Sequence, residues 1–173
     1  MIAILLNDAS FEQDIRELLM AFYPGETFTH KEEEAGEAEL IVRGVRDGNS
    51  FSLDVTPVKK EVVHFALIYP DFSNRFETKN EIKRTLYRLL SAQTGRELPW
   101  GTLTGIRPTK IALTKLYDGW TDEQIETYMR ETYFTSKEKI DLSIDVAERE
   151  RRLLSTIDYE NGYSLYVGIP FCP

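Results

Sequence analysis

Apolar side chains recur three and four residues apart in four stretches of the chain, which is the spacing of one face of an α-helix. Each stretch therefore predicts a helix with a single buried stripe. The four stripes are Ile15, Leu18, Leu19 and Phe22; Ile82, Leu86, Leu89 and Leu90; Ile125, Tyr128 and Met129; and Ile140, Ile144 and Ala147. A further helix, the third in chain order, is predicted to carry Ile111, Leu113 and Leu116.

Sequence signals also predict where these helices begin and end. The third helix is expected to begin at Pro108, because proline is favoured in the first helical turn. Pro24 and Gly25 are expected to end the first helix, and Gly95 the second. The last helix is expected to reach about Ile157. The other four starts are capping boxes, Ser or Thr followed three residues later by Glu or Gln: Ser10/Gln13, Thr78/Glu81, Thr121/Gln124 and Thr135/Glu138.

A different period, alternation of apolar and polar residues, predicts strands between the first two helices. Residues 51–56 place Phe51, Leu53 and Val55 on one face, which is typical of a half-buried strand. Residues 40–46 are also strand-like, and Asp47-Gly48 between the two runs predicts a hairpin.

Three further strands are predicted in this part of the chain. Residues 1–6 predict a buried first strand, and residues 27–31 a weaker one. Residues 62–69 are apolar on both faces, so we expect them at the centre of the sheet.

The combined pattern predicts an α+β fold. Residues 1–95 have the order β-α-β-β-β-β-α, which we interpret as an accessory domain built from a small mixed sheet and two helices. Residues 96–160 form a helical segment. In residues 161–173, Tyr163, Tyr166 and Val167 belong to a β-rich, alternating run that predicts the first strand of a further domain.

Composition excludes several classes of protein. With 42% hydrophobic and 29% charged residues, the chain resembles ordinary globular proteins. The longest apolar run is far shorter than the roughly 20 residues of a membrane span, so no membrane partner is expected. No basic segment precedes the apolar residues 1–6, which argues against a signal peptide. The single Cys172 excludes an intrachain disulfide, and we therefore expect a cytoplasmic protein.

Charge is unevenly distributed along the chain. Residues 75–115 contain nine Lys or Arg and three Glu, so this segment has a net charge of +6. The whole chain, in contrast, has a net charge of −8. Lys79 and Lys83, like Arg84 and Arg88, are four residues apart on one predicted helix. A solvated helix face is the favoured interpretation. The alternative is an anion-binding surface for a substrate or RNA, with Arg84, Arg88, Arg107 and Lys110 as candidates.

The most specific motif closes the chain, where the predicted strand runs into Gly168-Ile169-Pro170-Phe171-Cys172-Pro173. This arrangement resembles the first barrel strand and cluster loop of radical S-adenosylmethionine (radical SAM) enzymes. It is most similar to the oxygen-independent coproporphyrinogen III oxidase group. The resemblance implies that Cys172 is the first of three cysteines that bind a [4Fe–4S] cluster. It also implies that Tyr166 contacts S-adenosylmethionine, which the reduced cluster cleaves to a 5′-deoxyadenosyl radical. Gly168 departs from the family, which places His there.

A second block, Trp100-Gly101-Thr102-Leu103-Thr104-Gly105-Ile106-Arg107-Pro108-Thr109-Lys110, is similar to the HemZ branch of that group. Its glycines lead into a predicted helix, but the block lacks the Gly-Lys-Ser/Thr of a phosphate-binding P-loop. A structural turn with a helix cap is the favoured interpretation, and an anion-contacting loop is the alternative. His30 and His64 have no partner at metal-ligand spacing, so we interpret both as structural.

These resemblances imply a function for a longer protein. The chain is expected to be the N-terminal accessory region of a radical SAM oxidoreductase that decarboxylates porphyrinogen propionates in haem biosynthesis. The fragment is expected to be inactive and to contain no cofactor, because a cluster needs three thiolates. Two alternatives are a haem chaperone and an RNA-binding module. Net acidity and the lack of an RNP, KH or GXXG signature argue against nucleic acid. Nothing in the sequence defines the oligomeric state.

Overall fold

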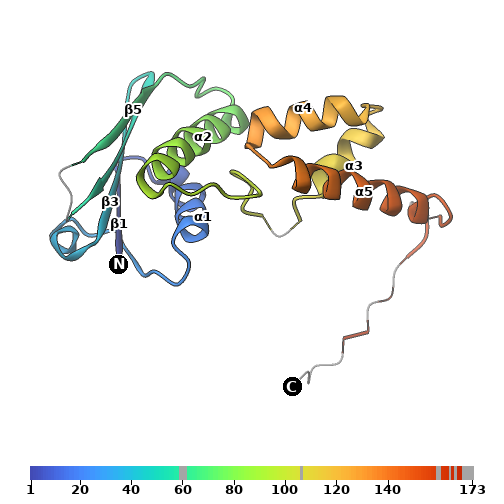
Figure 1. Ribbon diagram of the computed structural model, residues 1–173, viewed down its shortest axis with the longest axis horizontal. Helices are drawn as coiled ribbons and strands as arrows, with labels where there is room; N and C mark the ends of the chain where they lie inside the picture. The colour runs from blue at the N-terminus through green and yellow to red at the C-terminus, as the bar shows by residue number, and fades with distance from the viewer. Residues whose placement is uncertain (59–61, 106, 159–160, 164, 166, 169–173) are drawn as a thin grey trace.

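A computed structural model describes residues 1–58, 62–105, 107–158, 161–163, 165 and 167–168 (Figure 1). The strands among them are β1 (Ile2–Leu6), β2 (Phe28–Thr29), β3 (Leu40–Asp47), β4 (Ser50–Pro57) and β5 (His64–Ile68). The helices are α1 (Glu12–Phe22), α2 (Arg75–Thr94), α3 (Lys110–Tyr117), α4 (Asp122–Tyr133) and α5 (Lys137–Leu154), with 3₁₀ turns η1 (Ala9–Phe11) and η2 (Glu32–Glu37).

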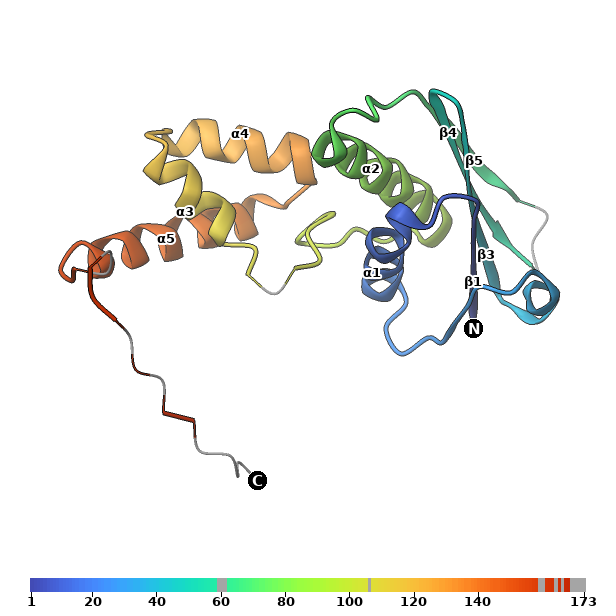
Figure 2. The same cartoon turned by 180° about the vertical axis from the view of Figure 1, so that it is seen from behind.

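The strands form one mixed sheet in the order β2-β1-β3-β4-β5. β1 is parallel to β2 and β3, whereas β4 is antiparallel to both β3 and β5. Helices α1 and α2 lie on one face of this sheet, and the short η2 lies on the other (Figures 1 and 2). The predicted α+β class and the β-α-β-β-β-β-α order are therefore confirmed.

The main core lies between the sheet and helices α1 and α2. The apolar stripe of α1 and the inward residues of β1, β3 and β4 are almost completely excluded from solvent, which is the burial that the alternating and helical patterns predict. The members with no more than 2% exposure are Ile2, Ile4, Ile15, Leu18, Leu19, Phe22, Val42, Phe51, Leu53, Val55, Ile82, Leu86 and Leu90.

The predicted hairpin is present between β3 and β4. Asp47 pairs with Ser50, so a two-residue turn of Gly48 and Asn49 joins the strands. Gly48 has a φ of 56°, in the left-handed region that glycine adopts at low cost. This turn sets a register in which Phe51, Leu53 and Val55 all face the helices.

The prediction that residues 62–69 lie at the centre of the sheet is wrong. β5 is an edge strand, paired with β4 along one side. Its inward residues contact α2, but Phe65 and Leu67 point away from the helices and are 62% and 47% exposed. The apolar character on both faces therefore comes from an uncovered outer face and not from burial on both sides.

The capping boxes were predicted correctly at one helix of four. Thr121 and Gln124 form the reciprocal pair at the start of α4. At α2, Asn74 accepts from the Glu77 amide and starts the helix four residues before Thr78, whose hydroxyl donates to the Asp71 carbonyl. At α5, Ser136 caps in place of its neighbour Thr135. At α1, the η1 turn occupies Ser10, and Asp8 caps that turn.

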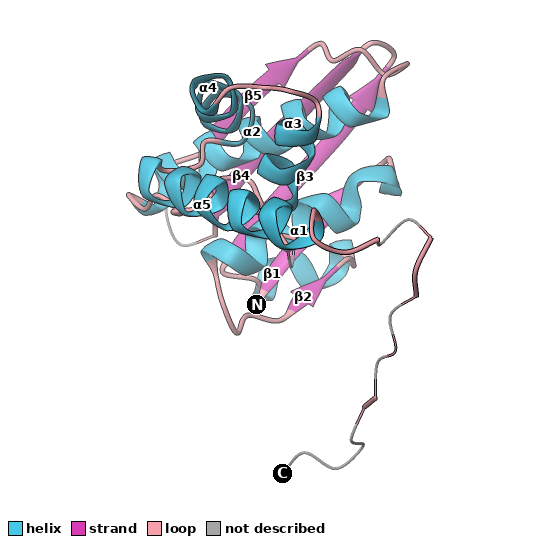
Figure 3. Ribbon diagram, turned by 90° about the vertical axis from the view of Figure 1, so that its right-hand side faces the viewer, coloured by secondary structure: helices cyan, strands magenta, loops and turns pink. Residues whose placement is uncertain are grey.

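Helices α3, α4 and α5 form a second core, built from Ala112, Leu113, Leu116, Ile125, Met129, Ile140, Ile144 and Ala147. This helical segment lies in front of the sheet, on the side that carries α1 and α2 (Figure 3). Two predicted bounds shift, because α3 begins at Lys110, two residues after Pro108, and α5 ends at Leu154. Among the described residues, no helix combines the length and apolar character that crossing a membrane requires.

The strand predicted from Tyr163 to Val167 is not confirmed. Tyr163, Leu165 and Val167 belong to no strand and are 94%, 81% and 76% exposed. Alternation can indicate a strand, but the strand needs a neighbour for its backbone N–H and C=O groups, and no described segment pairs with these three residues. Tyr166 and Cys172 lie outside the described residues.

Candidate functional site

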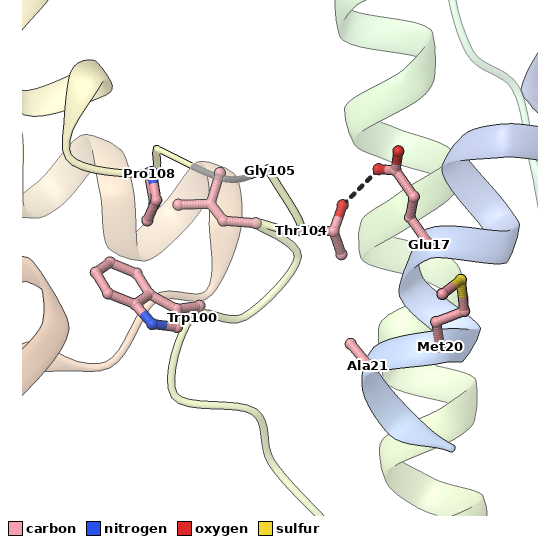
Figure 4. A pocket seen from close by; sticks show the side chains of 8 residues that line it. Glu17, Met20, Ala21, Trp100, Thr104, Gly105 and Pro108 are labelled. Carbon is pink, nitrogen blue, oxygen red and sulfur yellow. Dashed lines mark hydrogen bonds between the residues drawn. The ribbon is translucent and has the colours of Figure 1, made fainter. Parts of the chain in front are cut away.

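A groove of about 610 Å³ lies between α1 and the loop that enters α3 (Figure 4). One wall consists of Glu17, Met20 and Ala21 on α1. The opposite wall belongs to the Trp100–Lys110 block and consists of Trp100, Leu103, Thr104, Gly105 and Pro108. The motif that sequence analysis singled out is therefore one side of a groove between the sheet unit and the helical segment.

A chain of hydrogen bonds closes the end of this groove. The Lys83 ammonium donates to the Thr104 hydroxyl at 2.9 Å, and that hydroxyl donates to Glu17 Oε2 at 2.8 Å. Lys79 adds an ion pair of 3.3 Å with Asp14 on the same side of α1. Residues from α1, α2 and the loop thus share one polar network, and Thr104 is the link between a cation and an anion.

Burial and neighbouring opposite charges shift the pKa values of Lys83 and Glu17 in opposite directions. Desolvation lowers the pKa of Lys83, while the carboxylates of Asp14 and Glu17 act to raise it. Desolvation would raise the pKa of Glu17. Hydrogen bonds from Gln13 and Thr104 and the charges of Lys83 and Lys79 outweigh it, so the pKa of Glu17 is lowered. Glu17 is therefore held as a carboxylate at the wall of the groove.

The position of Lys83 corrects the interpretation of α2 as carrying a solvated basic face. Lys83 is only 6% exposed, and its ammonium points to Thr104 and not into solvent. The four-residue spacing of Lys79 and Lys83 correctly predicted that both lie on one side of α2. The loop that covers this side is joined to α2 by a contact that spans 21 residues of sequence, and no local pattern signals such a contact.

Backbone contacts and hydrogen bonds connect the Trp100–Lys110 block and the adjacent Pro99 to the junction of α4 and α5. Gly101 has a φ of 57°, and a Cβ there would overlap the Tyr133 carbonyl oxygen. The backbone amide of Thr102 donates to that same carbonyl at 2.7 Å. The Ser136 amide donates to the Pro99 carbonyl at 2.9 Å. This part of the block is a structural turn, as the sequence favoured, but Thr109 at the start of α3 makes no side-chain capping hydrogen bond, so the expected helix cap is not confirmed.

Two of the four candidate anion-binding residues lie on α2 and contact the end of α4. Arg84 donates at 3.3 Å to the Thr132 carbonyl in the last turn of α4, where the helix dipole favours a cation. The guanidinium of Arg88 lies 4.9 Å from the ring centroid of Phe134, the left-handed residue that ends α4. Both arginines therefore contribute to the contact between α2 and α4.

The other two candidates, Arg107 and Lys110, line a separate pocket of about 320 Å³. Lys115, Tyr128 and Tyr133 also contribute to its wall. Arg107 forms an ion pair with Glu150 on α5, and Lys110 is exposed in the first turn of α3. The structure brings these two residues to one pocket, whose lining does not include Arg84 or Arg88. Anion binding by either pair stays a prediction.

The described residues contain no group of three or more His, Cys, Asp or Glu that could hold a metal ion. His30 follows β2 and His64 begins β5, and these two strands lie at opposite edges of the sheet. His30 Nδ1 lies 3.2 Å from the Ile4 carbonyl and Nε2 lies 3.4 Å from Glu12, so this histidine contacts β1 and α1. The proposed cofactor residues Tyr166 and Cys172 are outside the described part.

Sequence reasoning missed Glu17 and Lys83 as a pair. Glu17 borders the apolar stripe of α1, and no local motif distinguishes it from the other carboxylates of that helix. Its role emerges only when Thr104, 87 residues later, is placed beside it.

Comparisons with known proteins give one informative relationship. No family model matches the chain, and no solved structure matches it significantly. Over 122 residues, or 68% of its length, the chain is 34% identical to the oxygen-independent coproporphyrinogen-III oxidase-like protein HemZ of Bacillus subtilis (strain 168). The match covers 24% of HemZ, so the chain spans about a quarter of the curated relative that it matches. The chain is therefore related to the HemZ-type, oxygen-independent coproporphyrinogen-III oxidase-like proteins.

Proposed function

We propose that the chain is the N-terminal accessory region of a longer radical SAM oxidoreductase that acts on a porphyrinogen in haem biosynthesis. The observation that carries the proposal is the 34% identity to HemZ over 122 residues. The sequence Ile169-Pro170-Phe171-Cys172, which resembles the start of a cluster loop, adds an independent reason to expect this chemistry.

In this proposal the described residues provide a rigid support. The Lys83–Thr104–Glu17 network joins the sheet unit to the loop, and the contact of Gly101 with Tyr133 joins the loop to α4. Arg84 adds a hydrogen bond between α2 and α4. Helix α5 packs on both α3 and α4 through residues up to Ala147. The chain beyond α5 would then continue from a helix that is anchored in this core.

The proposed cofactors are a [4Fe–4S] cluster and S-adenosylmethionine. Cys172 would supply one of three thiolates and Tyr166 a contact to S-adenosylmethionine, but both residues lie outside the described part of the chain. The bound pair would supply a 5′-deoxyadenosyl radical, and the protein would bind, orient and shield the reactants. The single Cys172 also suits a reducing cytoplasm.

The native gene provides the first test. We expect its sequence to continue with cysteines four and seven positions after Cys172, because a cluster of this type requires three thiolates on a short loop. The longer protein, reconstituted anaerobically, should show the broad visible absorption of an iron–sulfur cluster and should oxidise coproporphyrinogen. Cys172→Ser should abolish both, and the 173-residue chain should be colourless. A gene that lacks one or both of these downstream cysteines would exclude the radical SAM assignment.

Gly168 favours a second candidate, a haem chaperone, because it replaces the histidine of the oxidases and has no side chain to hydrogen-bond or donate a proton. Titration of the longer protein with haem, compared with its turnover of coproporphyrinogen, separates the two. Stoichiometric haem binding without turnover would support the chaperone. Turnover would support the oxidase.

A further inference from the structure

A pocket of about 320 Å³ lies between the beginning of α3 and side chains of α4. Ile111 of α3 and the rings of Tyr128 and Tyr133 of α4 give it an apolar and aromatic surface. The two rings meet edge to face, with their centroids 5.7 Å apart. The volume is at the lower end of the roughly 300–1,000 Å³ of ligand pockets. The pocket therefore suits a small ligand with an aromatic ring, because aromatic groups pack favourably on one another.

Three cations line the same pocket: Arg107, Lys110 and Lys115. Arg107 pairs with Glu150 on α5, but a guanidinium has five N–H donors and can bind a second anion. The Lys115 ammonium is 3.7 Å from a carboxylate oxygen of Asp118, and Lys110 is exposed at the first position of α3. Three cations and the two carboxylates beside them leave a net charge of +1, which matches one carboxylate on a ligand.

The tyrosine pair adds an uncharged hydrogen-bond donor. The hydroxyl oxygens of Tyr128 and Tyr133 are 3.4 Å apart, so one hydroxyl donates to the other and the second keeps its proton for another acceptor. Tyr133 is only 7% exposed, and burial raises the pKa of its phenol, which keeps this side chain neutral. Glu77 and Arg84 also act on this pKa, in opposite directions, and their charges cancel. A ligand carboxylate has the acceptor oxygens that the remaining proton requires.

The start of α3 also favours an anion. Thr109 precedes the helix and makes no side-chain capping hydrogen bond. The partial positive charge at the helix N-terminus is therefore not offset by a capping side chain, and Lys110 lies beside it. The helix end and the lysine attract the same sign of charge.

We infer that this pocket binds a small aromatic carboxylate, with its ring against Tyr128 and Tyr133 and its carboxylate beside Lys110 and Arg107. A neutral aromatic molecule would make no use of the cations, and inorganic phosphate would make no use of the rings. Each should therefore bind more weakly than a ligand that combines the two. The site would act in this way whatever reaction the longer protein catalyses.

NMR titration of the isotope-labelled 173-residue chain with 3-phenylpropionate provides the test. Amide signals of residues 110–115 and of Tyr128 should shift and saturate, with a dissociation constant of about 1 mM, as expected for a ligand of this size. 3-Phenylpropanamide keeps the ring without the charge, and inorganic phosphate keeps a negative charge without the ring. We expect each to bind at least about fivefold more weakly.

Variants locate the site. Lys110→Gln removes an exposed cation and should weaken the binding of 3-phenylpropionate about fivefold, because the carboxylate loses a charged hydrogen-bond donor. Arg107→Gln carries the same expectation, so a folding defect in one variant leaves the other informative. Lys31→Gln is the matched control, because it makes the same change in net charge at an exposed lysine beside η2 and should leave the dissociation constant unchanged. Circular dichroism checks that each variant is folded.

An absence of saturable shifts up to about 20 mM 3-phenylpropionate would overturn the inference. Equal binding of the amide or of phosphate would also overturn it, because the charge or the ring would then contribute nothing. So would equal weakening by Lys31→Gln and Lys110→Gln, which would indicate an effect of net charge alone. Shifts confined to the groove beside Glu17 would place the ligand in a different site and would likewise contradict the assignment.

Discussion

The hydroxyl of Thr104 donates a hydrogen bond of 2.8 Å to the carboxylate of Glu17, 87 residues earlier in the chain. The same oxygen accepts from the buried ammonium of Lys83 at 2.9 Å. Thr104 therefore satisfies a cation and an anion on two different helices, and it connects the loop to both. Loss of this one hydroxyl should remove a hydrogen-bond partner from both Lys83 on α2 and Glu17 on α1.

Thr104→Val should reduce the free energy of unfolding by about 1–3 kcal/mol, because a buried polar group that loses its partner retains its desolvation cost. Valine keeps the shape of the side chain but removes both hydrogen bonds. Thr114→Val is the matched control, because Thr114 is exposed and its hydroxyl donates within α3 to the Lys110 carbonyl. Urea unfolding measures both. Equal, small losses would show that the Thr104 network does not stabilise the chain.

Gly101→Ala should destabilise the chain by more than about 2 kcal/mol, because a Cβ would overlap the Tyr133 carbonyl and φ is positive. Gly105 lies in the same loop, and a Cβ there would have no atom within 4 Å. Gly105→Ala is therefore the matched control and should change stability by less than about 0.5 kcal/mol. Similar thermal melts of the two variants would contradict the close contact of Gly101 with α4.

Leu86→Ala tests the buried face of α2. Leu86 is fully buried, so we expect a loss of about 2–5 kcal/mol from the removed contacts and the cavity left behind. Leu142→Ala on α5, where the leucine is 44% exposed, provides the comparison and should cost much less. Denaturant melts measure both losses. A loss below about 0.5 kcal/mol at Leu86 would place this face of α2 outside the core.

Elements that depend on local periodicity could be predicted from sequence. The stripe of Ile15, Leu18, Leu19 and Phe22 is completely buried, and Asp47-Gly48 does mark the hairpin. These signals suffice because a helix face or a two-residue turn is defined by neighbouring residues. The sequence also located the Trp100–Lys110 block, which forms one wall of the groove.

What could not be predicted depends on contacts between distant segments. An apolar strand at the edge of a sheet and one at its centre have the same composition, so the sequence of β5 did not reveal its exposed face. Thr78 has the residue type of a helix cap, but Asn74, four residues earlier, caps α2. The sequence of α2 by itself predicts a solvated Lys83. The side chain is buried because the loop that carries Thr104 covers it.

Asp54 on the outer face of β4 should make stability depend on pH. Burial raises its pKa above the ordinary value of 3.8, and the hydrogen bond from Thr56 and the charge of Arg43 act in the opposite direction. The folded chain therefore binds this proton more tightly than the unfolded chain. The resulting stabilisation is complete below the unfolded pKa and is lost as pH rises through the folded pKa.

Asp54→Asn removes this titration and keeps an oxygen that can accept from Thr56. The variant should be more stable than the unmodified chain near neutral pH, and its advantage should shrink as pH falls from about 7 to about 4. Urea unfolding of both proteins across this range measures the difference, which cancels the titration of all other groups. A constant difference would show that Asp54 has no raised pKa.

Charge reversal can separate the structural role of the basic residues from a role in anion binding. Arg84 and Arg88 contact Thr132 and Phe134, so changing both to Glu should destabilise the 173-residue chain by about 1 kcal/mol or more. Lys110→Glu alters an exposed residue in the first turn of α3 and should leave its stability nearly unchanged. Thermal unfolding distinguishes the two.

If the basic residues steer an anionic porphyrinogen, Lys110→Glu should lower kcat/KM of the longer protein several-fold at low salt and leave kcat unchanged. The loss should shrink as salt increases, because the Debye length falls from about 30 Å at 0.01 M to about 8 Å at 0.15 M. Because Lys110→Glu leaves the α2–α4 contact intact, such an effect cannot come from destabilisation.

If Lys110 instead binds RNA, Lys110→Glu should weaken RNA binding by the 173-residue chain in a salt-dependent way and leave the porphyrinogen kinetics unchanged. If neither assay responds to Lys110→Glu, Lys110 takes no part in capturing an anion.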